Sequence, residues 1–280
     1  MTPTDTPDRE IIDNIVVWHR PRVTVLSRPA FDPAALRAHL SHPCSFDVFA
    51  TPASAAERLA EAAGRTCYTS WTNPRPGGTE TYLAHILEVG HGSVLEHASF
   101  SFLISGVSRT LTHELLRHRA GTAISQLSQR YADQGPHGFV APPGWGVPGP
   151  CPIHRGWEDG DWVRARRDAL ARYRHVYVRE VAAAGRAGLA GTAARKQARG
   201  VARGELPGDA ASELVWTGNV RAIRHVLEMR CHEAADWEIR RLMNAVYQIM
   251  LIECPILFAD YVRHDLTDGT YAIETRTKKV

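Results

Sequence analysis

The chain has 280 residues, of which 44% are hydrophobic, and its 33 Lys and Arg against 30 Asp and Glu give a net charge of +3 at pH 7. This length and hydrophobic content are sufficient to bury a sizeable core, as one large domain or two small ones. The basic excess is too small to indicate nucleic-acid binding from charge alone, and no apolar run is long enough to predict a membrane span.

The five cysteines are scattered along the chain and form no CxxC pair. An odd number at such spacing argues against a disulfide framework and favours a reducing, cytoplasmic location. The N-terminal residues also lack the charged and then apolar pattern of a signal peptide. Nothing in the sequence indicates a thiolate nucleophile, and Cys254, just before Pro255, is expected to be a buried hydrophobe.

The N-terminal part of the chain predicts a loose arm followed by strands and helices. Residues 1–20 are polar and rich in Pro and Asp, which is typical of an arm outside a single domain over 21–280. Ser54 and Glu57 have the spacing of a capping box and predict a helix that ends at Gly64. We further expect strands at 22–27, 46–50 and 99–105, and a helix over 79–89 that ends before Gly90.

The C-terminal part predicts mostly helices. Ser108 is placed to cap a helix that carries residues 117–119. Residues 133–163 are crowded with Pro, Gly and Trp, which predicts a long surface flap. Helices are expected over 163–184, 192–203, 220–230 and 233–253, with Asn219 as the N-cap of the third. A few strands among several helices predict a mixed α/β (α+β) fold, with a small central sheet flanked by helices.

Basic side chains gather in two neighbouring stretches. In the helix expected after residue 108, Arg109, His113 and Arg117 would lie within roughly 80° of one another, with apolar residues behind them. The triplet Arg-His-Arg at 117–119 is followed closely by the polar run Ser-Gln-Leu-Ser-Gln-Arg-Tyr at 125–131. Such a density of forked donors suits an anionic ligand with many oxygens, such as a nucleotide. A solvated helix face is the alternative explanation for either stretch taken alone.

The histidines do not predict a zinc site. His113 and His118 are five residues apart, which places them about 140° apart around a helix rather than on one face. The sequence contains no other group of His and Cys with the spacing of metal ligands. We therefore expect no metal.

The two basic stretches resemble the signature of the flavin-dependent thymidylate synthases, in which an Arg-His-Arg triplet is followed after seven residues by a serine. Here the serine is Ser128, one position further on, so an extra residue lies within 120–124, beside Gly121. Two further blocks are similar to the family and stand in the same order. They are Glu96-His97, and Arg203 with Pro207 followed by Asn219, Arg221 and Arg230. The resemblance extends over residues 46 to 262.

The resemblance implies the fold of this family and a role for each matching residue. Arg230 would be catalytic, at the pyrimidine carbonyl, where a cationic donor stabilises developing negative charge. The residues implied to bind the substrate are Arg109, Glu114, Gln126, Ser128, Gln129, Arg130, Arg203 and Arg230. The residues implied to bind FAD are His97, Arg117, His118, Arg119, Gln126, Asn219, Arg221 and His225.

The activity implied by the resemblance is methylation of uracil C5 in a uridylate. Methylenetetrahydrofolate would supply the carbon, and FAD reduced by NADPH would supply the hydride. The partner would be a small-molecule nucleotide, not a nucleic acid or a membrane. The assembly would be a homotetramer with FAD at the subunit junctions.

Two departures from the family pattern bear on the substrate and the cofactors. The extra residue beside Gly121 lengthens the loop before Ser128, which should change the shape of the pocket. We therefore hypothesise that UMP is accepted as well as dUMP, or instead of it, as in relatives that serve nucleoside-antibiotic biosynthesis. In addition, Ala234 stands where the family commonly has a histidine, and His232 is the nearby substitute.

Two other functions remain open. A basic protein could bind nucleic acid through the helices at 109–119 and 164–186, although the sequence has no RNP, KH or zinc-finger pattern. The other alternative is a flavoprotein of the same fold that transfers no carbon, and Ala234 favours it. A yellow protein would argue against the first alternative, and a methylated product would exclude the second.

Overall fold

The computed structural model describes residues 8–40, 49, 51–72, 76–143, 145 and 159–277, and its class is mixed α/β as predicted. The strands are β1 (Arg9–Ile12), β2 (Ile15–Trp18), β3 (Arg22–Ser27), β4 (Ser99–Ser108), β5 (Thr122–Gln126), β6 (Phe139–Val140), β7 (Ala211–Asn219), β8 (Val262–Asp265) and β9 (Tyr271–Glu274). The helices are α1 (Pro33–His39), α2 (Ala55–Tyr68), α3 (Gly78–Glu88), α4 (Arg109–Leu115), α5 (Asp159–Arg186), α6 (Gly191–Ala202), α7 (Val220–Arg230), α8 (Trp237–Glu253) and α9 (Pro255–Phe258), with 3₁₀ turns η2 (Gly92–His97) and η3 (Arg203–Glu205). None of the described helices combines the length and apolar character needed to cross a bilayer.

The chain divides into two compact units, where the sequence led us to expect one domain over 21–280. Unit 1 comprises residues 1–22, 104–117 and 125–215. Unit 2 comprises residues 23–103, 118–124 and 216–280. One boundary falls between Arg117 and His118, so the Arg-His-Arg triplet contributes to both units.

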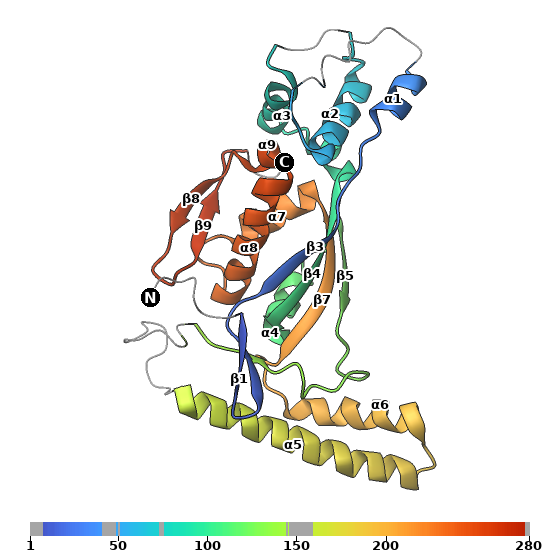
Figure 1. The fold of residues 1–280 in the computed structure, drawn as a ribbon, viewed down its shortest axis with the longest axis vertical. Coiled ribbons are helices and arrows are strands. Elements are labelled where there is room, and N and C mark those ends of the chain that lie inside the picture. The colour runs from blue at the N-terminus through green and yellow to red at the C-terminus, as the bar shows by residue number, and fades with distance from the viewer. Residues whose placement is uncertain are drawn as a thin grey trace. The chain divides into compact units, whose positions relative to one another are not determined.

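Unit 1 is built around a pair of helices and a small sheet. α5 and α6 pack side by side (Figure 1). The sheet has the strand order β1-β2-β6, with β1 antiparallel to β2 and β2 parallel to β6. The core between these elements includes Ile15, Val17, Phe139, Trp162, Val163, Leu170, Tyr173 and Ala202, each at most 5% exposed. Because Ala202 belongs to this core, the core fixes the C-terminal end of α6.

Unit 2 contains α2, α3, α7, α8 and α9, together with the antiparallel hairpin β8–β9. α8 packs against α7 and α9 and buries Leu242, Met243 and Val246 completely. α7 buries Ile223 and Leu227, which lie four residues apart on one helix face. This packing fixes the helix that also carries His225 and Arg230.

A four-stranded sheet has the strand order β3-β4-β7-β5, and β4, β5 and β7 each contribute residues to both units. Within unit 2, Phe100 and Phe102 on β4 are buried, as the alternating pattern predicted. The Phe102 ring stacks on Trp216 of β7, with centroids 5.7 Å apart. β5 and β7 were not predicted from the sequence, because both strands are rich in polar and small residues.

The N-terminal segment differs from the loose arm expected over 1–20. Residues 9–18 form the hairpin β1–β2, and Ile15 and Val17 are buried in the core of unit 1. Asp13 and Asn14 between the strands have φ values of 48° and 62°, the left-handed backbone of a two-residue hairpin turn. The polar residues at this position therefore form a turn between two paired strands.

The flap expected over 133–163 is partly regular structure. Gln134 is buried, β6 pairs with β2, and α5 begins at Asp159. Residues 144 and 146–158 lie outside the described residues. The same holds for all of the strand expected at 46–50 except Phe49, which is in a single 3₁₀ position.

The local signals at helix starts are mostly confirmed. α2 has the predicted capping box, with Ser54 N 2.7 Å from Glu57 Oε2, but it continues past Gly64. That glycine is buried against the Tyr82 side chain, so tertiary packing accommodates it within the helix.

The start of α7 is also confirmed. α7 has the predicted bounds, and Asn219 Oδ1 accepts a hydrogen bond from the backbone N of Ala222 at 2.8 Å. α8 begins after the N-cap Asp236, later than the predicted residue 233.

The helix that follows Ser108 is shorter than predicted. Ser108 Oγ accepts a hydrogen bond from Leu111 N at 2.9 Å, which confirms the predicted cap. α4 nevertheless ends at Leu115, so the prediction that it carries residues 117–119 is wrong. The chain turns shortly afterwards at Gly121, whose φ of 68° is incompatible with a continuing helix. The triplet therefore lies in a loop.

Candidate functional site

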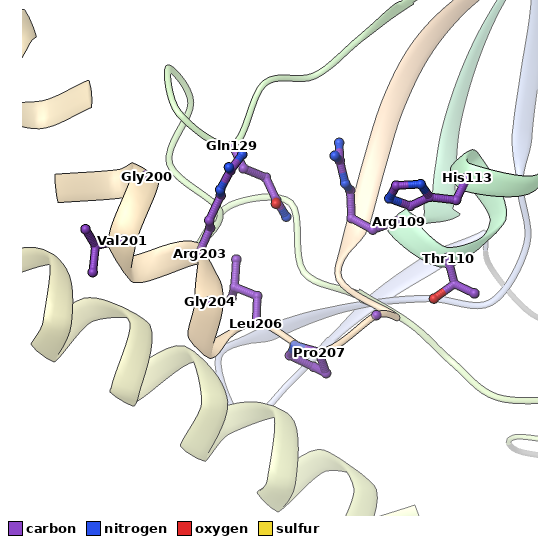
Figure 2. Close-up of a pocket in the computed structure, with 11 residues that line it drawn as sticks. Arg109, Thr110, His113, Gln129, Gly200, Val201, Arg203, Gly204, Leu206 and Pro207 are labelled. Atoms are coloured by element: carbon purple, nitrogen blue, oxygen red, sulfur yellow. The ribbon is translucent and has the colours of Figure 1, made fainter. Parts of the chain in front are cut away.

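A pocket of about 540 Å³ lies in unit 1, where segments distant in the sequence meet (Figure 2). The start of α4 contributes Arg109, Thr110 and His113, and the chain after β5 contributes Gln129. The other lining residues come from the end of α6, from η3 and from the following loop, and they are Gly200, Val201, Arg203, Gly204, Leu206, Pro207 and Gly208. Two arginines and a histidine thus face this pocket, and none of its described lining residues is acidic.

Backbone hydrogen bonds hold the start of α4 against the loop before β7. Arg109 N donates to Ala210 O at 3.1 Å, and Thr110 N donates to Gly208 O at 3.1 Å. The absence of a side chain on Gly208 permits this approach, because a Cβ there would lie 2.5 Å from Thr110 Oγ1. The position of Arg109 at the pocket therefore follows from main-chain contacts, which do not depend on its own side chain.

Arg109 and Arg203 affect each other electrostatically. Burial lowers the pKa of Arg109, and the charge of Arg203 lowers it further. Arg109 Nη1 donates a hydrogen bond to the neutral acceptor Leu127 O at 3.4 Å. An anion in the pocket would relieve the repulsion and accept hydrogen bonds from both guanidinium groups.

The polar run after β5 lies beside the same pocket. Gln129 lines it, and the Nε2 of this residue donates to Gln134 Oε1 at 3.2 Å. Arg130 is exposed, and its side chain approaches the pocket wall at Gly200. A Cβ added to Gly200 would lie 4.0 Å from Arg130 Nε. Ser128 Oγ accepts from Arg130 N at 3.4 Å. The structure thus brings this segment together with the two arginines of the pocket.

Gln126 has an internal role that the sequence did not reveal. Its Nε2 donates to Thr112 Oγ1 at 2.8 Å and to Ser212 Oγ at 3.0 Å. These contacts tie β5 to α4 and β7 within unit 1. Glu114 is half-buried on α4 and Arg117 is exposed beyond its end, and neither lines the pocket.

A second cluster lies in unit 2, where the loop after Arg117 meets α7. Arg230 Nε lies 2.8 Å from His118 Nε2, and the rings of His118 and His225 are edge to face with centroids 6.1 Å apart. Burial lowers the pKa of His118 to about 4, and the charges of Arg230 and His225 act in the same direction. His118 is therefore neutral at physiological pH, and its Nε2 accepts the hydrogen bond.

The loop that carries His118 is anchored on the N-terminus of α7. Gly121 O accepts from Asn219 N at 3.0 Å, and Thr122 Oγ1 donates to His118 O at 2.6 Å. An added Cβ on Gly121 would lie 2.6 Å from Asn219 Nδ2. Glycine is thus required here both by the positive φ and by the close approach of Asn219.

The remaining residues expected at the flavin are more exposed. Arg221 Nη1 forms an ion pair with Glu96 Oε1 at 2.5 Å, which joins α7 to η2. His97, at the end of η2, and Arg119 are exposed. His232, the substitute considered for the histidine that Ala234 replaces, is also exposed, and its Nδ1 accepts from Ala234 N at 3.1 Å.

Arg224 on α7 belongs to the interior. Arginine side chains are mostly exposed in folded proteins, but this one is fully buried. Its Nη1 donates to Asp260 Oδ1 and its Nη2 donates to Asp260 Oδ2, each at 2.8 Å. Asp260 Oδ2 also accepts hydrogen bonds from the hydroxyl groups of Thr275 and Thr277. A buried guanidinium is tolerated because this carboxylate neutralises it. Arg224 is therefore part of the interior of unit 2.

The candidate residues are divided between the two units. Unit 1 holds Arg109, Glu114, Arg117, Gln126, Ser128, Gln129, Arg130 and Arg203, and unit 2 holds His97, His118, Arg119, Asn219, Arg221, His225 and Arg230. Thr110 and most of the pocket wall at 200–208 were not predicted from the sequence. Arg203 and Pro207 matched the family, but the Pro-Gly pair at 207–208 by itself indicates a turn and not a pocket.

The fold and the pocket define a mixed α/β protein with an arginine-lined site for a small anionic ligand, and the comparisons identify its family. The family model of the thymidylate synthase complementing protein matches residues 50–256. The flavin-dependent thymidylate synthase of Mycobacterium sp. (strain JLS) is 44% identical over 231 residues, 80% of this chain and 87% of the relative. That of Mycobacterium tuberculosis (strain ATCC 25177 / H37Ra) is 43% identical over 223 residues, 79% of this chain and 85% of the relative. The chain belongs to the flavin-dependent thymidylate synthase family and is an enzyme of this type.

Two solved structures share the fold. PolB from Streptomyces cacaoi, a UMP/dUMP methylase, was solved bound with 5-Br UMP and matches with a TM-score of 0.57 and 20% identity, covering 87% of this chain and 94% of that one. The PolB structure with 5-Br dUMP matches with a TM-score of 0.57 and 21% identity, covering 87% of this chain and 95% of that one. At this level of identity the likeness establishes the fold alone.

Proposed function

We propose that the protein methylates C5 of a uridylate. The C5–H bond is replaced by a C5–CH3 bond: methylenetetrahydrofolate supplies the carbon, NADPH-reduced FAD supplies the hydride, and the C5 proton is released. The pocket that Arg109 and Arg203 both line carries the proposal, because two cationic side chains and no acidic one among its described lining residues favour an anion. Membership of the family supports the reaction.

The phosphate of the nucleotide is the proposed occupant of this pocket. A phosphate monoester offers three acceptor oxygens, and two guanidinium forks can bind them in a bidentate way. Thr110 and Gln129 add neutral donors to the same space. Ser128 and Arg130 lie at its edge and complete the proposed set of nucleotide-binding residues.

The chemistry of the residues around 117–121 and along α7 fits a flavin cofactor. FAD carries a diphosphate, and the exposed Arg117 and Arg119 form no ion pair within the described part of the chain, so their charges can serve it. His97, His118, Asn219, Arg221 and His225 are the further residues assigned to this cofactor. When bound, FAD supplies the hydride for the methylene group.

Arg230 is the residue proposed to activate the pyrimidine. Bond formation at C5 draws negative charge onto a ring carbonyl oxygen, and a fixed guanidinium stabilises that charge. Activation of this kind needs no thiolate. Burial raises the pKa of Cys231 to about 12 and raises that of Cys254 as well, so both thiols stay protonated.

The substrate is dUMP, UMP or both. The names of relatives that are 43% to 44% identical favour dUMP. The extra residue within 120–124 favours UMP, since it lengthens the loop that precedes Ser128, and a UMP substrate would suit nucleoside-antibiotic biosynthesis. A cytoplasmic location and a homotetramer belong to the same proposal, and light scattering of the purified protein would test the latter.

Product mass analysis is the decisive test. The protein is incubated with FAD, NADPH, methylenetetrahydrofolate and either dUMP or UMP in parallel. A gain of one CH2 group on dUMP, on UMP or on both would establish the substrate. A yellow protein that oxidises NADPH and leaves both nucleotides unchanged would identify a non-methylating flavoprotein and overturn the proposal. A colourless protein with salt-dependent affinity for nucleic acid would overturn it too.

A further inference from the structure

His118 makes two contacts with one helix, which a contact to the flavin does not explain. Its Nε2 lies 2.8 Å from Arg230 Nε, and its ring meets His225 edge to face. Both partners belong to α7. The imidazole of the triplet is therefore packed against the helix that supplies the proposed catalytic arginine.

The hydrogen bond has a fixed direction. Arg230 Nε–H can only donate, so His118 Nε2 must accept, and the proton of the neutral ring must be on Nδ1. The titratable and charged groups that face the ring from α7 are Arg230 and His225, and both disfavour the imidazolium form. A guanidinium is planar and rigid, so a bond at Nε restricts the direction of the whole group.

We infer that His118 is a positioning residue for Arg230: as a neutral acceptor it orients the guanidinium that acts on the pyrimidine. The inference rests on the proposed function and deepens it, since it gives the histidine of the triplet a task besides contact with the cofactor. The hydrogen bond and the docking of the loop on α7 are the observations that carry it.

The same geometry connects the extra residue within 120–124 to the catalytic arginine. Gly121 docks on the first turn of α7, where an added Cβ would lie 2.6 Å from Asn219 Nδ2 and 3.0 Å from Ala222 Cβ. Thr122 in turn holds the backbone of His118 through the 2.6 Å hydrogen bond. A change in loop length therefore acts on the His118–Arg230 pair.

A mutant cycle tests whether His118 acts through Arg230. His118→Phe keeps a ring and removes the acceptor, and kcat for the methylated uridylate should fall about 10- to 100-fold, as for the loss of a hydrogen bond from a charged donor. His118→Gln places an amide oxygen near the Nε2 position and should recover most of this loss. In an Arg230→Gln background, His118→Phe should lower kcat no further.

The nucleotide KM should stay unchanged in His118→Phe. Because His118 is also assigned to the cofactor, kcat is expressed per bound flavin, which is read from absorbance. Multiplicative losses in the double variant would overturn the inference. So would a loss of bound flavin that accounts for the lost turnover, because His118 would then act through the cofactor.

A second measurement needs no turnover. Nitrogen NMR of labelled histidine should show His118 as the Nδ1–H form, with a pKa that rises in Arg230→Gln, because a repelling charge has been removed. An unchanged His118 titration would overturn the inference whatever the activity. If the pKa rises but even the wild-type protein methylates neither nucleotide, the pair stands and the proposed function fails.

The contribution of the docking of Gly121 on α7 can be tested with a matched pair of glycine variants. Gly121→Ala introduces a clash with Asn219 at a φ of +68° and should lower kcat. Gly269→Ala creates similar strain at a φ of +77° in the same unit, but nothing lies within 4 Å of its Cβ, so kcat should be unchanged. Equal losses in the two variants would show that backbone strain alone is responsible and would contradict the role of the docked loop.

Discussion

Arg109 and Arg203 face one pocket from α4 and from the end of α6, and the charge of Arg203 lowers the pKa of Arg109. The two residues are far apart in the sequence. Main-chain hydrogen bonds from residues 109 and 110 hold the start of α4 against the loop at 208–210, which follows Arg203 in the chain. Two like charges held in this way repel each other and favour the binding of an anion.

Removal of either charge should weaken nucleotide binding. We expect Arg109→Gln and Arg203→Gln each to raise the Kd for dUMP or UMP about 10- to 100-fold, because each loses a charge-assisted hydrogen bond to phosphate. Calorimetry with the nucleotide and with uridine separates the phosphate contribution, since uridine binding should change little. Arg195→Gln is the control, because Arg195 is exposed on α6 and does not line the pocket. Equal weakening by that variant would argue for a general charge effect.

Inorganic phosphate should stabilise the folded protein. A ligand that binds only the folded state at about 100 times its Kd contributes about 2.7 kcal/mol to the free energy of unfolding. The melting temperature should therefore rise with phosphate concentration in the wild-type protein and stay constant in the Arg109→Gln/Arg203→Gln double variant. Sodium chloride at matched ionic strength provides the reference, and an equal rise in that salt would contradict specific binding.

The buried Arg224–Asp260 pair should make stability depend on acid pH. Burial by itself raises the pKa of Asp260, but hydrogen bonds and charge from Arg224, with Thr275 and Thr277, outweigh it and hold the pKa below its usual value. The stabilisation is therefore present above the unfolded-state pKa of about 3.9 and is lost as pH falls through the lower folded value.

Asp260→Ala should cost about 3–5 kcal/mol at neutral pH, since it leaves the Arg224 charge buried without its partner. Urea unfolding at neutral and acid pH measures both effects, and the acid sensitivity should be smaller in the variant. Arg263→Gln removes one partner of an exposed pair with Asp265 and should cost less than about 1 kcal/mol.

The buried cysteines should not support catalysis. Among the cysteines that the structure describes, Cys67 is exposed, whereas Cys231 and Cys254 are buried and their pKa values are raised by burial. Iodoacetamide at neutral pH should therefore modify Cys67 in the native protein and spare Cys231 and Cys254. Peptide mapping identifies the modified sites. Loss of turnover in proportion to modification of Cys231 or Cys254 would contradict a reaction without a thiolate.

Local signals allowed parts of the fold to be predicted residue by residue. The Asn219 cap and the apolar spacing of the following residues predicted α7 correctly, because a cap and a helix face involve neighbours within one turn. The Ser54 box predicted the start of α2 for the same reason. The end of that helix was not predictable from neighbouring residues, because Gly64 packs against Tyr82 of another helix.

The site itself required contacts between distant residues. The sequence marked Arg109 and Arg203 separately, but their convergence depends on a loop held by main-chain hydrogen bonds. The burial of Arg224 could not be predicted from its neighbours, because its neutralising partner lies 36 residues away. The pairing of His118 with Arg230 joins positions 112 residues apart, and no periodicity or spacing rule connects them.

The Arg224–Asp260 pair also sets an order of events during synthesis. α7 leaves the ribosome before Asp260, which follows Arg224 by 36 residues, and before Thr277, which follows it by 53. Until those residues emerge, burial of that face of the helix would enclose an uncompensated charge. We therefore expect α7 to dock less stably in a nascent chain arrested within α8 than in a chain that extends beyond α9.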